Sequence, residues 1–157
     1  MGGDGMEIRV EKTFRVDAPI DRVWEFLTDP EQVVECVPGA ELTEKSEREF
    51  SGRLGIKVGP VQAKYRGEGR FVELDRERHT MRVVAHGAGD GSADVEMRGE
   101  LRALEGGGTE SSVEAVANVG GRMAQMGSRL IKFVSDRLFD QFVARVRERL
   151  EEGGASG

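Results

Sequence analysis

The sequence has little of several residue types on which common kinds of site depend. Its 157 residues include one cysteine, two histidines and four prolines. A single cysteine excludes an intrachain disulfide framework and fits a reducing compartment. Neither histidine has carboxylate or thiol partners at the spacing that a metal site needs. These scarcities exclude a disulfide-stapled secreted domain and disfavour a histidine-based metal centre.

Long apolar runs and an excess of positive charge are also missing. No stretch approaches the roughly 20 apolar residues that a membrane-spanning helix requires, and the N-terminus lacks the pattern of a signal peptide. The formal net charge of -6 disfavours nucleic acid as a partner. The sequence therefore predicts a cytoplasmic protein with one domain at residues 6–152, between a flexible leader (1–5) and a disordered tail (153–157).

The most regular pattern is an amphipathic stretch from Val119 to Leu150. Apolar residues recur along it every three or four positions, as on one face of an α-helix. They are Met123, Met126, Leu130, Val134, Leu138, Phe142, Val146 and Leu150. At about 1.5 Å per residue, such a helix would be roughly 45 Å long. A helix of this length needs a large apolar partner surface.

Most of the remaining chain alternates between apolar and polar residues, as half-buried strands do. The first such segment is 7–16, and two short helices follow it, at 20–27 and 31–36. From 41 to 119 the alternation continues between short turns, with a shift after Phe71 that predicts a β-bulge. The fold class is therefore α+β, with an antiparallel sheet of about seven strands curved around the long C-terminal helix.

Glycine is abundant, with 22 residues, and many glycines fall inside strands rather than in turns. The face that we assign inward is small: Ala63, Gly67, Gly69, Ala85, Gly87, Gly89, Ala93, Gly99, Ala115 and Ala117. One interpretation is that the helix approaches the sheet closely there, or that glycine relieves curvature. The other, which we favour, is that sheet and helix enclose an elongated apolar cavity for a lipophilic ligand.

The cavity interpretation predicts a set of lining residues, most of them large side chains on the inward face. They are Trp24, Leu54, Tyr65, Phe71, Met81, Val83, Val95, Met97, Leu101, Met123, Met126, Leu130 and Val134. Trp24 and Tyr65 would present polar tips to the cavity or simply pack in the core. Gly120, Gly121 and Gly127 flank the two helix-start methionines and would form a gate, although ordinary core methionines give the same pattern.

The other reactive residue types predict no catalytic set, metal site or cofactor. Cys36 is expected to be a buried structural thiol rather than a nucleophile. His79 and His86 fall on the outward side of one strand, and Asp94 and Glu96 fall on the outward side of the next. Solvent-facing side chains are the simplest interpretation of all four.

Three segments resemble the CoxG family, the G subunits of carbon monoxide dehydrogenase, within the START/Bet v 1-like helix-grip superfamily. They are CVPGA at 36–40, KVGPV at 57–61 and GGRMAQMG at 120–127. The resemblance extends over about residues 6–150 and is supported by Ala18-Pro19, Val23-Trp24 and Gly108-Thr109. It implies a sheet that grips the C-terminal helix around a hydrophobic cavity.

The resemblance also implies a function. Such a protein would bind a hydrophobic small molecule, lipid-like or quinone-like, without catalysis and as an accessory to a molybdenum-containing hydroxylase of the carbon monoxide dehydrogenase type. Its partners would be hydroxylase subunits and, transiently, the inner face of the membrane. Many relatives in the superfamily are cyclases, dehydratases or hydrolases, so an enzyme acting on an aromatic or polyketide-like substrate is the alternative. A module that only binds proteins is a third.

Overall fold

The computed structural model describes residues 5–152, so the predicted leader, apart from Gly5, and the predicted tail lie outside the described residues. The elements are β1 (Met6–Val16), α1 (Ile20–Leu27), α2 (Pro30–Val34), β2 (Ala40–Lys45), β3 (Glu49–Val58), β4 (Val61–Asp75), β5 (Thr80–Gly89), β6 (Ser92–Ala103), β7 (Thr109–Gly120), α3 (Arg122–Gln125), α4 (Ser128–Arg147) and a π-helical turn (Glu148–Glu152). The predicted order of a strand, two short helices, six strands and a long helix is confirmed.

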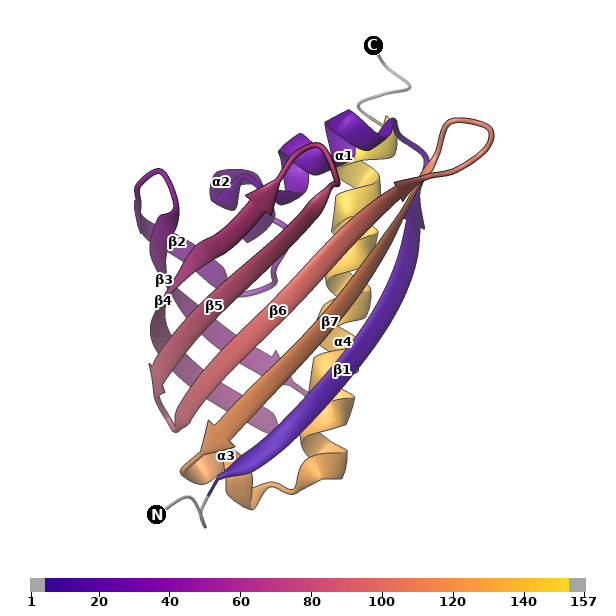
Figure 1. Cartoon of the computed structure of the whole chain (residues 1–157). Coiled ribbons are helices and arrows are strands. Elements are labelled where there is room, and N and C mark those ends of the chain that lie inside the picture. Colours follow the sequence, from indigo (N-terminus) through magenta and orange to yellow (C-terminus); the bar gives the residue numbers. More distant parts are fainter. Residues whose placement is uncertain (1–4, 153–157) are drawn as a thin grey trace.

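The strands form one antiparallel sheet of seven strands in the order β1-β7-β6-β5-β4-β3-β2. From β2 to β7 each strand pairs with the next along the chain, whereas β1 pairs with β7, with Met6 opposite Val119. The segment that holds α1 and α2 therefore crosses from one edge of the sheet to the other. Figure 1 shows the sheet curving around α4, which lies along its concave side. The predicted helix-grip fold is confirmed.

A bulge interrupts the pairing of β4 with β5, and two glycines lie where neighbouring strand backbones come close. The register between β4 and β5 shifts between Phe71 and Glu73, which confirms the predicted bulge. A β-carbon at Gly67 would lie 2.6 Å from the carbonyl oxygen of His86, and one at Gly52 would lie 2.5 Å from that of Glu41. The atoms closest to these positions belong to neighbouring strands, so a close approach of α4 is the wrong explanation for them.

The C-terminal stretch is the element whose predicted extent is wrong, because Val119–Leu150 is not one helix. Strand β7 continues to Gly120, α3 makes a single turn, and α4 begins only at Ser128. Gly121 and Gly127 have φ angles of 72° and 87°, which a right-handed helix cannot contain. The helix-like spacing of apolar residues continues through this break. Such spacing depends on which side chains are buried and carries no information about the backbone angles between them.

The two short helices have local signals at their starts. Pro19 precedes α1 with a φ of -64°, and Val23, Trp24 and Phe26 are buried on the inner side of this helix. The carboxylate of Asp29 caps α2 by accepting a hydrogen bond from the backbone N–H of Glu31. Helix α2 ends at Val34, two residues before its predicted end. Across residues 5–152, no helix combines the length and apolar character that crossing a membrane requires.

Buried apolar side chains gather at the two ends of α4. At the C-terminal end the cluster joins β1, α1, the sheet and α4, through residues that include Phe14, Trp24, Leu101 and Val146. At the N-terminal end two smaller clusters include Ile8, Met123 and Ile131, and Val58, Val61 and Val134. The middle of the concave face is left for the site.

Candidate functional site

A cavity of about 690 Å³ lies between the concave face of the sheet and α4. Its wall takes side chains from β1 and from strands β3 to β7, from the middle of α4, and from α2 with the turn after it. A pocket of this volume accommodates a ligand of several rings or a lipid-sized chain. The structure thus contains the kind of space that the second interpretation of the glycine-rich and alanine-rich face predicts.

Small side chains keep the centre of this space open. Ala85 and Gly87 on β5, Ala93 on β6, and Ala115 and Ala117 on β7 all line the cavity. They are only half-buried, although they line the space between the sheet and α4. Side chains of one carbon or none cannot span the distance to the helix. The centre of the sheet therefore keeps accessible apolar surface, which a close-packed core would not have.

The structure brings together most of the residues predicted for the cavity. Those that line it are Leu54, Tyr65, Phe71, Met81, Val83, Val95, Met97, Met123 and Val134. Trp24 and Leu101 are instead buried in the core cluster near α1. Met126 and Leu130 pack against the small clusters near the start of α4 and do not line the cavity.

The predicted gate glycines lie beside the cavity rather than in its wall. Gly120 ends β7, and Gly121 and Gly127 flank α3. Met123 is the residue of this segment that reaches the cavity. Whether α3 moves during ligand entry stays a prediction.

Sequence reasoning missed one wall of the cavity. Val33 and Val34 of α2, and Val37 in the turn that follows, are half-buried and line it. A five-residue helix has too few turns for its apolar face to be assigned from periodicity. The CVPGA motif, which contains Val37, was the available signal.

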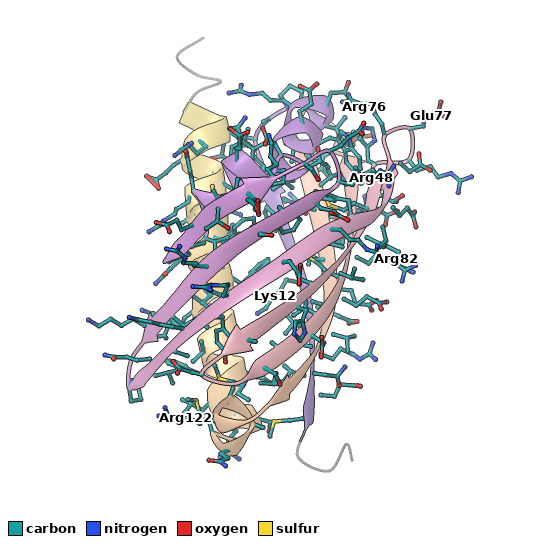
Figure 2. All side chains as sticks on the ribbon, turned by 90° about the vertical axis from the view of Figure 1, so that its left-hand side faces the viewer. Lys12, Arg48, Arg76, Glu77, Arg82 and Arg122 are labelled. Carbon is teal, nitrogen blue, oxygen red and sulfur yellow. The ribbon has the colours of Figure 1, made fainter. Side chains whose placement is uncertain are left out.

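Lys12 is a cation on the cavity wall. It lies on the inward side of β1, where alternation with Val10 and Phe14 predicts an apolar residue. Its Nζ atom is 2.7 Å from the carboxylate of Asp136 on α4 and 5.8 Å from the centre of the Phe139 ring. Figure 2 shows Lys12 midway along the molecule and Arg122 at the end where α3 lies. The ion pair joins β1 to α4 and neutralises the charge beside the cavity.

Tyr65 brings a polar atom into the apolar region near α3. Its side chain lines the cavity, and its hydroxyl oxygen is buried without a hydrogen-bond partner. Burial, and secondarily the negative charge of Asp90, raise the pKa of this phenol above its ordinary value. The phenol therefore stays protonated at neutral pH and is available to donate a hydrogen bond.

Of the other reactive residues, Cys36 and His79 lie away from the cavity, whereas His86 is among the residues that line it. Cys36 is fully buried, and burial raises the pKa of its thiol, as expected for a structural cysteine. His86 is exposed and contacts Asp94 at 2.6 Å. The prediction that His79 faces solvent is wrong, because its side chain is only 18% exposed and packs edge-on against Trp24. It precedes β5 with a φ of 54°, so strand alternation does not apply to it.

The side chains that commonly bind metals are dispersed over the molecule. Within 5–152, no group of three or more histidine, cysteine, aspartate and glutamate side chains is placed to hold a metal ion. The lining of the cavity is mostly apolar, and its polar groups include two paired cations, Lys12 and Arg53, the carboxylates of Glu41 and Glu68, the His86 imidazole and the buried Tyr65 hydroxyl.

Residues 13–151 match the family model of CoxG, the G subunit of carbon monoxide dehydrogenase. The chain belongs to this family. No match was found among curated protein sequences. The CoxG family and the fold together suggest that the protein binds a hydrophobic ligand.

Solved structures with the same fold include both uncharacterised proteins and an enzyme. A conserved protein from Geobacillus kaustophilus is 20% identical, with a TM-score of 0.85, over 92% of this chain and 96% of that chain. The Zhui aromatase/cyclase from Streptomyces sp. R1128 is 19% identical, with a TM-score of 0.69 and coverages of 93% and 94%. A START superfamily protein from Mycobacterium smegmatis is 14% identical, with a TM-score of 0.67 and coverages of 92% and 97%. At these identities the likeness shows the fold alone.

Proposed function

We propose that this CoxG family protein binds and carries a hydrophobic small molecule, lipid-like or quinone-like, in the cavity between the sheet and α4. The observation that carries the proposal is the apolar cavity of about 690 Å³. An apolar ligand gains roughly 25 cal/mol for each Å² of apolar surface removed from water. Keeping accessible apolar surface on the concave face is costly for folding, and a ligand that fills the cavity offsets this cost.

The proposed physiological role is that of an accessory to a molybdenum-containing hydroxylase of the carbon monoxide dehydrogenase type. The support is family membership over residues 13–151. The ligand would be exchanged with hydroxylase subunits and, transiently, with the inner face of the membrane, while the protein itself stays in the cytoplasm. The carrier works without catalysis in this proposal.

Ligand carriage is tested first by extracting the purified protein into organic solvent and identifying co-purified apolar molecules by mass spectrometry. Titration with diphenylhexatriene, a hydrocarbon whose fluorescence rises in apolar surroundings, gives the affinity of the cavity. Ala115→Trp places a large ring on the cavity wall, whereas Val116→Trp places it on the outer face of the same strand.

We expect Ala115→Trp to lose most of the diphenylhexatriene binding and Val116→Trp to retain it. Equal binding by both variants would place the ligand outside the cavity. Absence of any extracted or added apolar ligand would refute carriage altogether.

The accessory role has a separate test. A tagged copy expressed in the native host is purified, and co-purified proteins are identified by mass spectrometry. Molybdenum hydroxylase subunits are expected with the unmodified protein, and their recovery with Ala115→Trp as well would show that docking does not require a filled cavity. Normal ligand uptake without any hydroxylase subunits would refute the accessory role and leave carriage standing.

The enzyme alternative has less support. It requires a group in the cavity that gives or takes a proton during a reaction, either Tyr65 or a buried carboxylate. The raised pKa of Tyr65 disfavours a role as a base at neutral pH. Turnover of an aromatic or polyketide-like substrate that is abolished by Tyr65→Phe would favour the enzyme.

A further inference from the structure

The hydroxyl of Tyr65 is the one buried side-chain nitrogen or oxygen that lacks a hydrogen-bond partner within residues 5–152. Buried polar groups in proteins are nearly always paired, so an exception calls for an explanation. The neighbouring strand β5 leaves room for the ring. A β-carbon at Gly87 would be 3.8 Å from the Tyr65 ring, which is ordinary contact.

The surroundings of Tyr65 offer the hydroxyl no acceptor. Its side chain packs against a cluster of apolar residues near α3, namely Ile8, Ala63, Val119, Met123 and Ile131. Phenylalanine would make the same apolar contacts without the cost of burying an unpaired hydroxyl. Folding alone therefore does not account for tyrosine at this position, and the hydroxyl fits a partner that arrives with the ligand.

We propose that Tyr65 anchors the ligand by donating a hydrogen bond to a carbonyl oxygen, so that the oxygen-bearing end of an otherwise apolar molecule lies at the α3 end of the cavity. This inference rests on the proposed carriage of a hydrophobic molecule and adds the polar group that the molecule carries. The cavity wall around Tyr65 supplies apolar contact to the rest of the ligand.

The hydroxyl oxygen has almost no accessible surface. One neighbouring side chain must therefore change position for a carbonyl to reach it. Met123 both belongs to the cluster around Tyr65 and lines the cavity. Its unbranched side chain can change rotamer with little cost to packing.

The test uses two probes that differ by one carbonyl group, 9-fluorenone and the hydrocarbon fluorene. Binding of each to the whole protein is measured by equilibrium dialysis for the unmodified chain, Tyr65→Phe and Met97→Leu. Met97 lines the cavity, and leucine there conserves volume without affecting a hydrogen bond. The thermal midpoint of each unliganded variant is recorded as well.

We expect Tyr65→Phe to bind 9-fluorenone about tenfold more weakly and fluorene equally well. Met97→Leu should change the affinity for both probes by the same factor. The unliganded Tyr65→Phe protein should be at least as stable as the unmodified one, because it buries no unpaired hydroxyl.

Equal effects of Tyr65→Phe on the two probes would overturn the inference and leave carriage intact. A lower thermal midpoint of unliganded Tyr65→Phe would also overturn it, because the hydroxyl would then have a partner within the protein. If the unmodified protein bound diphenylhexatriene but neither of these probes, the inference would fail and carriage would stand; if it bound none of the three and no ligand could be extracted, carriage would fail as well.

Discussion

Gly67 and Gly87 face each other across β4 and β5 and both line the cavity, yet the structure predicts opposite effects when each becomes alanine. At Gly67 the new β-carbon would lie 2.6 Å from the carbonyl oxygen of His86, far inside ordinary contact distance. At Gly87 the closest atom is 3.8 Å away. Both backbones are extended, so the two substitutions differ in the space available and not in backbone strain.

Gly67→Ala must push two strand backbones apart, and we expect it to lower the free energy of unfolding by about 1–3 kcal/mol. Gly87→Ala should raise it by about 0.4–1 kcal/mol, because alanine has less conformational freedom than glycine in the unfolded chain. Urea denaturation followed by circular dichroism measures both, and the midpoints of thermal unfolding should differ by roughly 3–16 °C. Equal stability of the two variants would refute the assignment of Gly67 to close strand packing and of Gly87 to open space.

Three further predictions concern other parts of the fold. Thr109→Val should lower the free energy of unfolding by about 1–3 kcal/mol in urea titrations, because the buried Thr109 hydroxyl donates a hydrogen bond to the Ala18 carbonyl oxygen at 2.7 Å. Thr109→Ser keeps the hydroxyl and should recover most of the loss, and equal losses in the two variants would argue against the hydrogen bond. Gly127→Ala should lower the free energy of unfolding by about 1–3 kcal/mol in the same titrations, because the φ of 87° and ψ of 155° at Gly127 are accessible almost only to glycine. An unchanged urea midpoint would mean that the backbone between α3 and α4 has a different conformation. Because the pKa of the Cys36 thiol is raised in the folded protein, the unfolded chain releases this proton at a lower pH than the folded one. The thiol's contribution to stability should therefore fall as pH rises above the ordinary thiol range. In urea titrations from pH 7 to 10, the free energy of unfolding should fall less steeply for Cys36→Ala than for the unmodified protein, and identical pH profiles would contradict the burial of the thiol.

Much of the fold was predictable because its elements carry strong periodic signals. The alternation in β6, from Ala93 to Leu101, identifies the inward face without reference to any other strand. After Phe71 the apolar residues move from every odd to every even position, and this change located the bulge. A one-residue change in the alternation moves the apolar side chains to the other face of a regular strand, so a bulge is needed to keep them on the same face. The family was also identified from sequence alone, through three short motifs that the family model bears out over residues 13–151.

The candidate site was predictable only in part. Assigning the inward face of each strand correctly predicted that residues such as Val95 and Met97 line the cavity. Trp24 and Leu101 share the character of those residues but pack in the solid core near α1. The alternation along a strand shows that a side chain points inward, but it does not show whether other side chains fill that part of the interior.

The sequence by itself determined the order of the elements along the chain, the inward face of the sheet, the abundance of small residues on that face and the family. These follow from local chemistry, because alternation, turns and motifs are written in residues close together in the chain. The tertiary structure alone decided where the long apolar stretch breaks, how far α4 stands from Ala85 and Ala115, and that the Tyr65 hydroxyl has no partner. Those facts depend on distances between elements far apart in the chain, and no periodic pattern encodes such distances.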